Sequence, residues 1–123
     1  MLFSKILRSK GSLLFQSPAA QARADLESCL YGTGHLHSLS WGRIEIAISP
    51  HQIDVRNLYV NPGLVKQGIS SVVIDVLQKY ATEKRKSIEL LSVKDALIPA
   101  CKRRGFVETS GPFSDLRWTP TYN

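Results

Sequence analysis

The segment from Leu58 to Ser71 has the residue pattern of a site for an anion. An apolar run ends in Asn-Pro-Gly, and a loop ending in Gly68 leads into a long apolar periodicity typical of a helix. The first turn of a helix leaves backbone N–H groups unpaired and carries a partial positive charge. A glycine there lets a ligand approach the backbone closely. The segment therefore indicates a phosphate or pyrophosphate site, although it matches no P-loop or dinucleotide motif and a plain strand–turn–helix has the same spacing.

The surrounding sequence predicts the elements that would hold this segment. Ser17 and Pro18 begin a helix that Gly32 can end. Residues 44–48 and 53–60 alternate in polarity across a short turn, which predicts an antiparallel pair of strands. The helix after Gly68 has a buried face of Ile69, Val72, Val73, Val76, Leu77, Tyr80 and Ala81. The remaining predicted elements are a strand over 87–93, a helix over 95–104 and strands over 106–109 and 113–118. This order predicts an α/β or α+β sheet with helices on both faces.

Length and composition exclude several classes of protein. A chain of 123 residues with 43% apolar and 21% charged residues is an ordinary globular domain. Nothing in it approaches the roughly 20 consecutive apolar residues of a membrane helix, so we expect no membrane partner. The formal charge of +6 favours an anionic partner, which could be nucleic acid, an acidic protein or a phosphorylated cofactor.

The first sixteen residues differ from the rest. They contain Lys5, Arg8 and Lys10, several serines and no acid. We interpret 1–16 as a basic arm or first strand ahead of a single domain over 17–123, with an organellar import segment as the alternative. A cytoplasmic location is predicted, with import left open.

The cysteines and histidines predict neither a disulfide nor a metal site. Cys29 and Cys101 are far apart and have no CxxC spacing, which is typical of free thiols in a reducing compartment. His35 and His37 would share one strand face, but no third ligand lies near them except His51. We therefore expect no metal.

The run from Ile53 to Phe106 resembles the GNAT family of acetyltransferases, which use acetyl-coenzyme A. The family has a strand ending in a Leu-Tyr-Val-like segment and a Pro turn, as at 58–62 here. Next in the family come a loop of the type Arg/Gln-x-x-Gly-x-Gly/Ala and a long helix, and the loop matches 65–70 here. A strand with Val, matched by 90–93, and a short helix ending in Gly-Phe, matched by 101–106, follow. Two positions depart from the pattern, since Val65 replaces the first Arg or Gln and Ser70 the second small residue. The resemblance implies a mixed, mostly antiparallel sheet with helices on both faces.

The resemblance also implies site residues. Backbone N–H groups would bind the pyrophosphate of coenzyme A at Val65, Lys66, Gln67, Gly68, Ile69, Ser70 and Ser71. The pantetheine arm would pair with the strand at Leu58, Tyr59 and Val60. The family's Tyr general acid falls on Cys101, for which a buried structural thiol is the alternative.

The family's general base falls on Asp54, with Glu45 on the neighbouring strand as a substitute. Strand alternation places Ile53, Val55 and Tyr59 on one face and Asp54, Arg56, Leu58 and Val60 on the other. An exposed strand carboxylate with no catalytic role is the alternative for Asp54.

The function implied is transfer of an acetyl group from acetyl-coenzyme A, as co-substrate, to an amine of a protein or small molecule. The alternative is a non-catalytic GNAT-like module that binds a partner protein or coenzyme A. A third interpretation is a protein that binds nucleic acid through its Lys and Arg clusters. These clusters lie at predicted helix C-termini, where positive charge is favourable without any nucleic acid. A homodimer is also allowed for.

Overall fold

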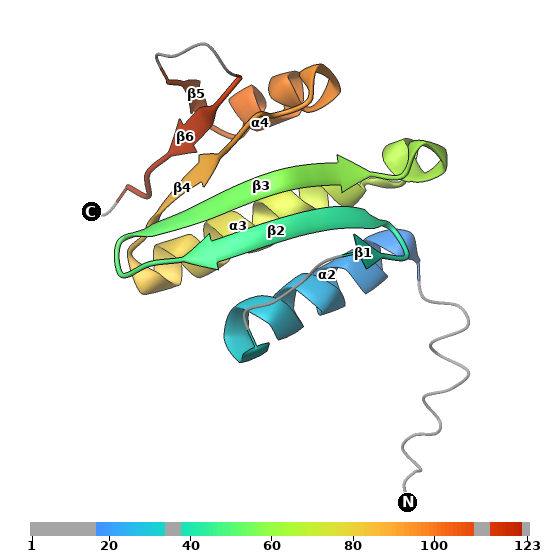
Figure 1. Cartoon of the computed structure of the whole chain (residues 1–123), viewed down its shortest axis with the longest axis horizontal. Coiled ribbons are helices and arrows are strands. Elements are labelled where there is room, and N and C mark those ends of the chain that lie inside the picture. Colours follow the sequence, from blue (N-terminus) through green and yellow to red (C-terminus); the bar gives the residue numbers. More distant parts are fainter. Residues whose placement is uncertain (1–16, 34–37, 110–113, 122–123) are drawn as a thin grey trace, which may run out of the picture.

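A computed structural model describes residues 17–33, 38–109 and 114–121 of the chain (Figure 1). The predicted arm over 1–16 and the pair His35 and His37 lie outside the described residues. No helix in these ranges combines the length and apolarity needed to cross a bilayer.

The described strands form one six-stranded mixed sheet in the order β1-β2-β3-β4-β6-β5. The strands are β1 (Ser38–Leu39), β2 (Gly42–Ile48), β3 (Gln52–Val60), β4 (Ser87–Leu90), β5 (Val107–Glu108) and β6 (Leu116–Trp118). Only the pair β3–β4 is parallel, and the other four pairs are antiparallel. The prediction of an α/β chain with a mixed, mostly antiparallel sheet is confirmed.

Two long helices form where the sequence predicts them. Helix α2 (Pro18–Ser28) begins at Ser17, whose hydroxyl accepts a hydrogen bond from the Ala20 N–H at 3.1 Å. Helix α3 (Ile69–Lys84) follows the 3-10 turn η2 (Pro62–Gln67) and ends at Arg85, which is left-handed with φ 57°. The shorter helical segments are η1 (Cys29–Thr33), η3 (Asp95–Leu97) and α4 (Ile98–Arg103).

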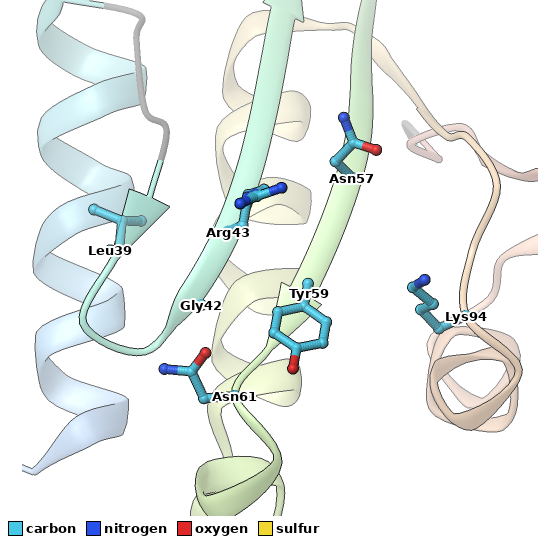
Figure 2. Close-up of a pocket in the computed structure, with 7 residues that line it drawn as sticks. All are labelled: Leu39, Gly42, Arg43, Asn57, Tyr59, Asn61 and Lys94. Carbon is cyan, nitrogen blue, oxygen red and sulfur yellow. The ribbon is translucent and has the colours of Figure 1, made fainter.

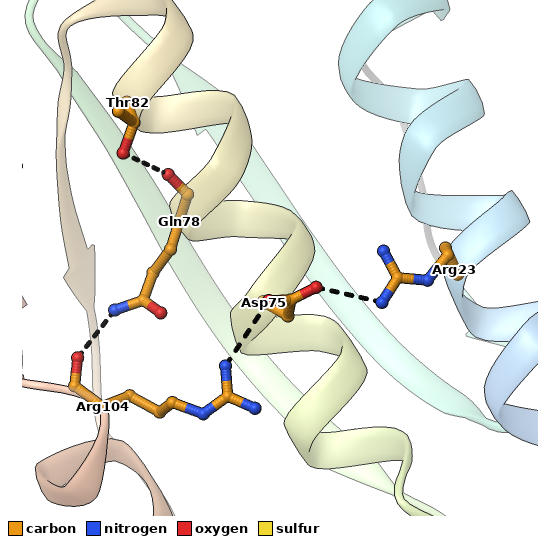
Figure 3. Close-up of polar contacts among 5 residues, drawn as sticks. All are labelled: Arg23, Asp75, Gln78, Thr82 and Arg104. Atoms are coloured by element: carbon orange, nitrogen blue, oxygen red, sulfur yellow. Dashed lines mark hydrogen bonds and ion pairs between the residues drawn. The ribbon is translucent and has the colours of Figure 1, made fainter.

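Helices α2 and α3 pack on the same face of the sheet, and the end of α4 contacts α3 (Figures 1 and 3). No helix among the described residues covers the opposite face, where Glu45, Arg56 and Arg117 are exposed. The expectation of helices on both faces is therefore wrong for this part of the chain. The physical reason is that most outward strand positions are polar, so this face has little apolar surface to bury against a helix.

Asp75 on α3 links the three helices (Figure 3). Its carboxylate contacts Arg23 of α2 at 3.0 Å and Arg104, just after α4, at 3.6 Å. The Gln78 side chain also donates to the Arg104 carbonyl at 2.8 Å. The charged side chains are more than a third exposed, so each ion pair contributes at most about 1 kcal/mol. These contacts fix helix positions more than they add stability.

One hydrophobic cluster runs from α2 to β6 between the helices and the inner face of the sheet. Its fully buried members include Leu26, Ile44, Ile53, Ile74, Leu77, Ile88 and Leu116. Trp41 is 1% exposed, and its indole N–H donates to the Asp25 carboxylate at 2.8 Å. This bond ties the turn between β1 and β2 to helix α2.

Strand β3 contains an irregularity that the alternation of the sequence did not predict. Glu45 pairs with Arg56 and Arg43 with Tyr59, so β3 has one residue more than β2 between these pairs. Asn57 takes a left-handed conformation with φ 53°, as an extra residue in a bulge can. The bulge reverses the faces of the residues after it. Tyr59 therefore lies 42% exposed on the face of Asp54 and Arg56, and Val60 is buried, the reverse of the prediction.

Candidate functional site

Strands β3 and β4 separate before β3 ends. Their parallel ladder has four pairs, from Gln52↔Ser87 to Val55↔Leu90, and closes where the Leu91 N–H donates to the Val55 carbonyl at 2.9 Å. Ser92 then turns the chain away with φ 52°, so β4 ends three residues before its predicted end. Over 56–60, β3 pairs with β2 alone among the described strands. A gap therefore opens in the sheet beside the carboxyl half of β3.

Backbone groups of β3 point into this gap. The Asn61 N–H donates to the Trp41 carbonyl on the β2 side at 2.9 Å. In a strand the N–H and C=O of one residue point to the same side and those of the next residue to the opposite side, so the N–H and C=O of Val60 point toward the gap. The N–H and C=O of Tyr59, opposite Arg43, point toward β2. Of the three predicted pantetheine contacts, Val60 thus has the suitable backbone orientation, and Tyr59 can contribute its side chain.

A pocket of about 390 Å³ lies beside the gap, on the face of the sheet that carries no helix (Figure 2). Six side chains line it together with the backbone of Gly42, namely Leu39, Arg43, Asn57, Tyr59, Asn61 and Lys94. Figure 2 shows α3 behind the strands and the labelled side chains in front, with Arg43 and Lys94 on opposite sides of Tyr59. The volume of the pocket falls in the range of small-molecule sites, roughly 300–1,000 Å³.

The pocket is positively charged. The side chains of Arg43 and Lys94 make no ion pair or hydrogen bond with any described residue, and no carboxylate is among the lining side chains. The Asn61 amide donates to the Ser40 carbonyl at 2.8 Å, which leaves its oxygen as an acceptor. Two cations, two amides and a phenol can therefore bind an anion and orient it.

The loop predicted to bind pyrophosphate follows β3 through η2 and leads into α3. Gly68 is left-handed with φ 79° and ψ 11°, and a Cβ placed on it would meet no atom within 4 Å. No side chain caps the N-terminus of α3, and its first turn contains no acid. Lys66, Gln67, Gly68 and Ser71 are exposed, Ser70 is half-buried and Ile69 is buried. The uncapped N-terminus of α3 therefore faces open space at Gly68 and is accessible to a ligand. Val65 lies within η2.

The two candidate bases lie on the open face but outside the pocket lining. Asp54 is half-buried and accepts a hydrogen bond from the Gln52 amide at 2.6 Å. Three residues of strand, about 10 Å, separate it from Asn57. Glu45 is exposed opposite Arg56, two residues from Arg43. Neither carboxylate reaches the pocket directly, so a proton would have to travel through water.

Cys101, the candidate acid, lies in the core. It is 0% exposed on α4, and burial raises the pKa of its thiol to about 11. Cys29 is also a buried free thiol whose pKa burial raises. A buried thiol with a raised pKa is a poor proton donor to a surface pocket, which favours the structural alternative for Cys101.

Burial of Cys101 makes stability fall at alkaline pH. The thiol ionises near pH 9 in the unfolded chain but only near pH 11 in the folded protein, so its contribution is complete below pH 9 and is lost as pH rises toward 11. We expect the free energy of unfolding of the parent to fall by roughly 2 kcal/mol more than that of Cys101→Ala over this interval. Urea denaturation of both proteins at several pH values measures this, and parallel curves would contradict it.

Gly42 lines the pocket where β2 and β3 lie close together, and no larger residue fits there without a shift of the backbone. A Cβ at this position would lie 1.9 Å from the Tyr59 carbonyl oxygen and 3.0 Å from the Val60 Cα. Gly42→Ala must push β2 and β3 apart, and we expect it to lower the free energy of unfolding by at least about 2 kcal/mol. Gly63→Ala is the matched control, since a Cβ there meets nothing within 4 Å. Equal urea midpoints for Gly42→Ala and the parent would disprove the close approach.

Sequence reasoning missed most of the pocket. It singled out Tyr59 but not Arg43, Asn57, Asn61 or Lys94. The Asn57 bulge brings Tyr59 to the open face, and Lys94 reaches the pocket from beyond β4. The available signal was an Asn within an otherwise regular strand, since Asn adopts left-handed conformations more readily than most residues. Among the described residues, no group of three or more His, Cys, Asp and Glu could hold a metal ion.

Comparison of the chain with models of protein families, with curated proteins and with solved structures finds no match.

Proposed function

We propose that this protein is a GNAT-like acyltransferase that moves an acetyl group from acetyl-coenzyme A to an amine. The observation that carries the proposal is the separation of β3 from β4 beside a pocket, next to the uncapped N-terminus of α3. An extended chain with amide groups can add to an exposed strand by backbone hydrogen bonds. The pantetheine arm of coenzyme A is such a chain, and its pyrophosphate suits the helix N-terminus.

In this proposal the chain positions the two reactants. Val60 would pair with the pantetheine arm, and the Gly68–Ser71 backbone would bind the pyrophosphate, which together fix the thioester at the gap. The acceptor amine would enter the pocket from the open face. Alignment of two reactants can supply about 7–11 kcal/mol of the barrier, so a site with few acid or base groups can still catalyse acyl transfer.

Acetyl transfer forms one bond and breaks one. The lone pair of the neutral amine attacks the thioester carbon, the C–N bond forms, and the C–S bond breaks to release coenzyme A as a thiolate. One proton of the original ammonium goes to solvent and a second protonates the thiolate. We assign Asp54 as the acceptor of the first proton, through water on the open face, with Glu45 as the substitute.

A non-catalytic module is the second candidate. The absence of a carboxylate from the pocket lining and the burial of Cys101 favour it. Such a module would bind coenzyme A, or a partner protein, without turnover.

Calorimetric titration with coenzyme A and an acetyl-transfer assay with a panel of amines test the proposal. We expect binding together with thiol release that depends on an amine. Binding without transfer would favour the module, and absence of binding would overturn both coenzyme A functions.

A further inference from the structure

The Arg43 and Lys94 side chains, which have no partner among the described residues, lie away from the proposed cofactor site. Arg43 and Lys94 flank Tyr59 on the open face, whereas the proposed pyrophosphate site lies at Gly68, beyond η2 (Figure 2). Arg23 and Arg104 pair with Asp75, whereas Arg56, on the same open face as Arg43, has no side-chain partner among the described residues and lies outside the pocket lining. Two solvated cations that converge on one pocket without a carboxylate are best explained by a ligand that supplies the negative charge.

We infer that the pocket binds an acceptor amine that carries an acidic group, either a phosphate or a carboxylate in addition to any α-carboxylate. This inference rests on the proposed acyltransferase function and names the substrate class of its acceptor site. An acidic group would pair with Arg43 and Lys94, and Asn57 and Tyr59 could orient it by hydrogen bonds.

Electrostatics disfavours a simple amine. An alkyl amine is an ammonium ion at neutral pH, and both cations of the pocket would repel it. An acceptor with an acidic group gains attraction for that group.

The pocket also fits a small acceptor better than a large one. Its volume of about 390 Å³ is near the lower end of small-molecule sites. Leu39 is the one aliphatic side chain in the lining. A compact, polar acid is therefore the class that its walls match.

Two pairs of acceptors, each an acid with a neutral partner, test this inference. The pairs are L-aspartate with L-asparagine and O-phospho-L-serine with L-serine, which also separate carboxylate from phosphate as the bound anion. We expect kcat/KM of the parent to favour at least one acid over its neutral partner by tenfold or more. Arg43→Gln and Lys94→Gln should each lower kcat/KM for that acid at least tenfold and for its neutral partner less than threefold. Equal use of acids and neutral partners by the parent would overturn the inference.

Matched controls and a second readout keep the result independent of turnover. Arg56→Gln removes a cation from the same face outside the pocket, and Lys79→Gln removes one from helix α3; both should retain the parent's preference. A tenfold loss of coenzyme A affinity in Arg43→Gln and Lys94→Gln would overturn the inference by assigning the cations to the cofactor. If the parent binds no coenzyme A, the proposed function fails, and ligand-detected NMR with the two acids decides the pocket separately. Binding of an acid that Arg43→Gln abolishes supports an anion site, and no binding of either acid overturns it.

Discussion

Replacement of Gly68 by glutamate is expected to weaken coenzyme A binding at least a hundredfold. Gly68 immediately precedes α3, and a side chain there would extend into the open space in front of the uncapped helix N-terminus. A unit charge about 5 Å from a charge of the same sign costs about 3 kcal/mol at an effective dielectric constant of about 20. A hundredfold loss corresponds to about 2.7 kcal/mol. Calorimetric titration with coenzyme A measures the effect.

Two variants separate repulsion from backbone strain. Gly68→Ala places a Cβ in a left-handed conformation, which costs about 1–2 kcal/mol of stability, but it adds no charge. Gly63→Glu adds the same charge in open space on η2. We expect both variants to bind coenzyme A within about tenfold of the parent, taking strain and distant charge as lesser effects. A folded Gly68→Glu protein that binds as tightly as the parent would place the pyrophosphate elsewhere.

Asp54→Asn is expected to lower acetyl transfer about a hundredfold, which is the lower end of the usual gain from general-base catalysis. Asparagine retains an acceptor for the Gln52 amide but cannot take up a proton. Asp54 is half-exposed, so the free energy of unfolding should change by no more than about 0.5 kcal/mol. Steady-state rates at saturating acetyl-coenzyme A, together with melting temperatures, measure both effects.

The register partner of Asp54 provides the control. Glu89 of β4 lies opposite Asp54, and Glu89→Gln makes the same change of charge on the neighbouring strand. Its turnover should match the parent. Transfer by Asp54→Asn within about threefold of the parent would remove Asp54 from the mechanism. A large loss in Glu45→Gln would then identify the carboxylate nearer to Arg43, and no loss in either variant would identify bulk water.

The local elements of this fold could be read from the sequence because their signals are local. Ser17 and Pro18 begin α2 as expected, and the periodic apolar face after Gly68 becomes α3. Residues 53–56 of β3 alternate as predicted. Beyond them a single extra residue at Asn57 exchanges the faces on which the following side chains lie. Composition and spacing contain little that distinguishes such a bulge from a regular strand.

The candidate site was predictable only in part, since it depends on pairing between distant segments. The loop at Gly68 has a local signature, and the structure places it at a helix N-terminus. Lys94 joins Arg43 at one pocket only because β4 departs from β3 at Leu91. Nothing in the sequence around Cys101 predicts that its side chain is buried, because its burial follows from how α4 packs against the core. Side-chain placement of this kind follows from tertiary contacts and not from propensity.

The four-pair ladder between β3 and β4 has a consequence for the order of folding. Strands β2 and β3 are joined by a short turn, closed where the Ser49 N–H donates to the Gln52 carbonyl, so this hairpin needs little loop closure. The parallel pairing of β4 must await the whole of η2 and α3, and such non-local contacts form slowly. The gap beside β3 is therefore expected to take shape late, when β4 adds to a preformed hairpin. A ligand bound across it would stabilise that final step of assembly by mass action.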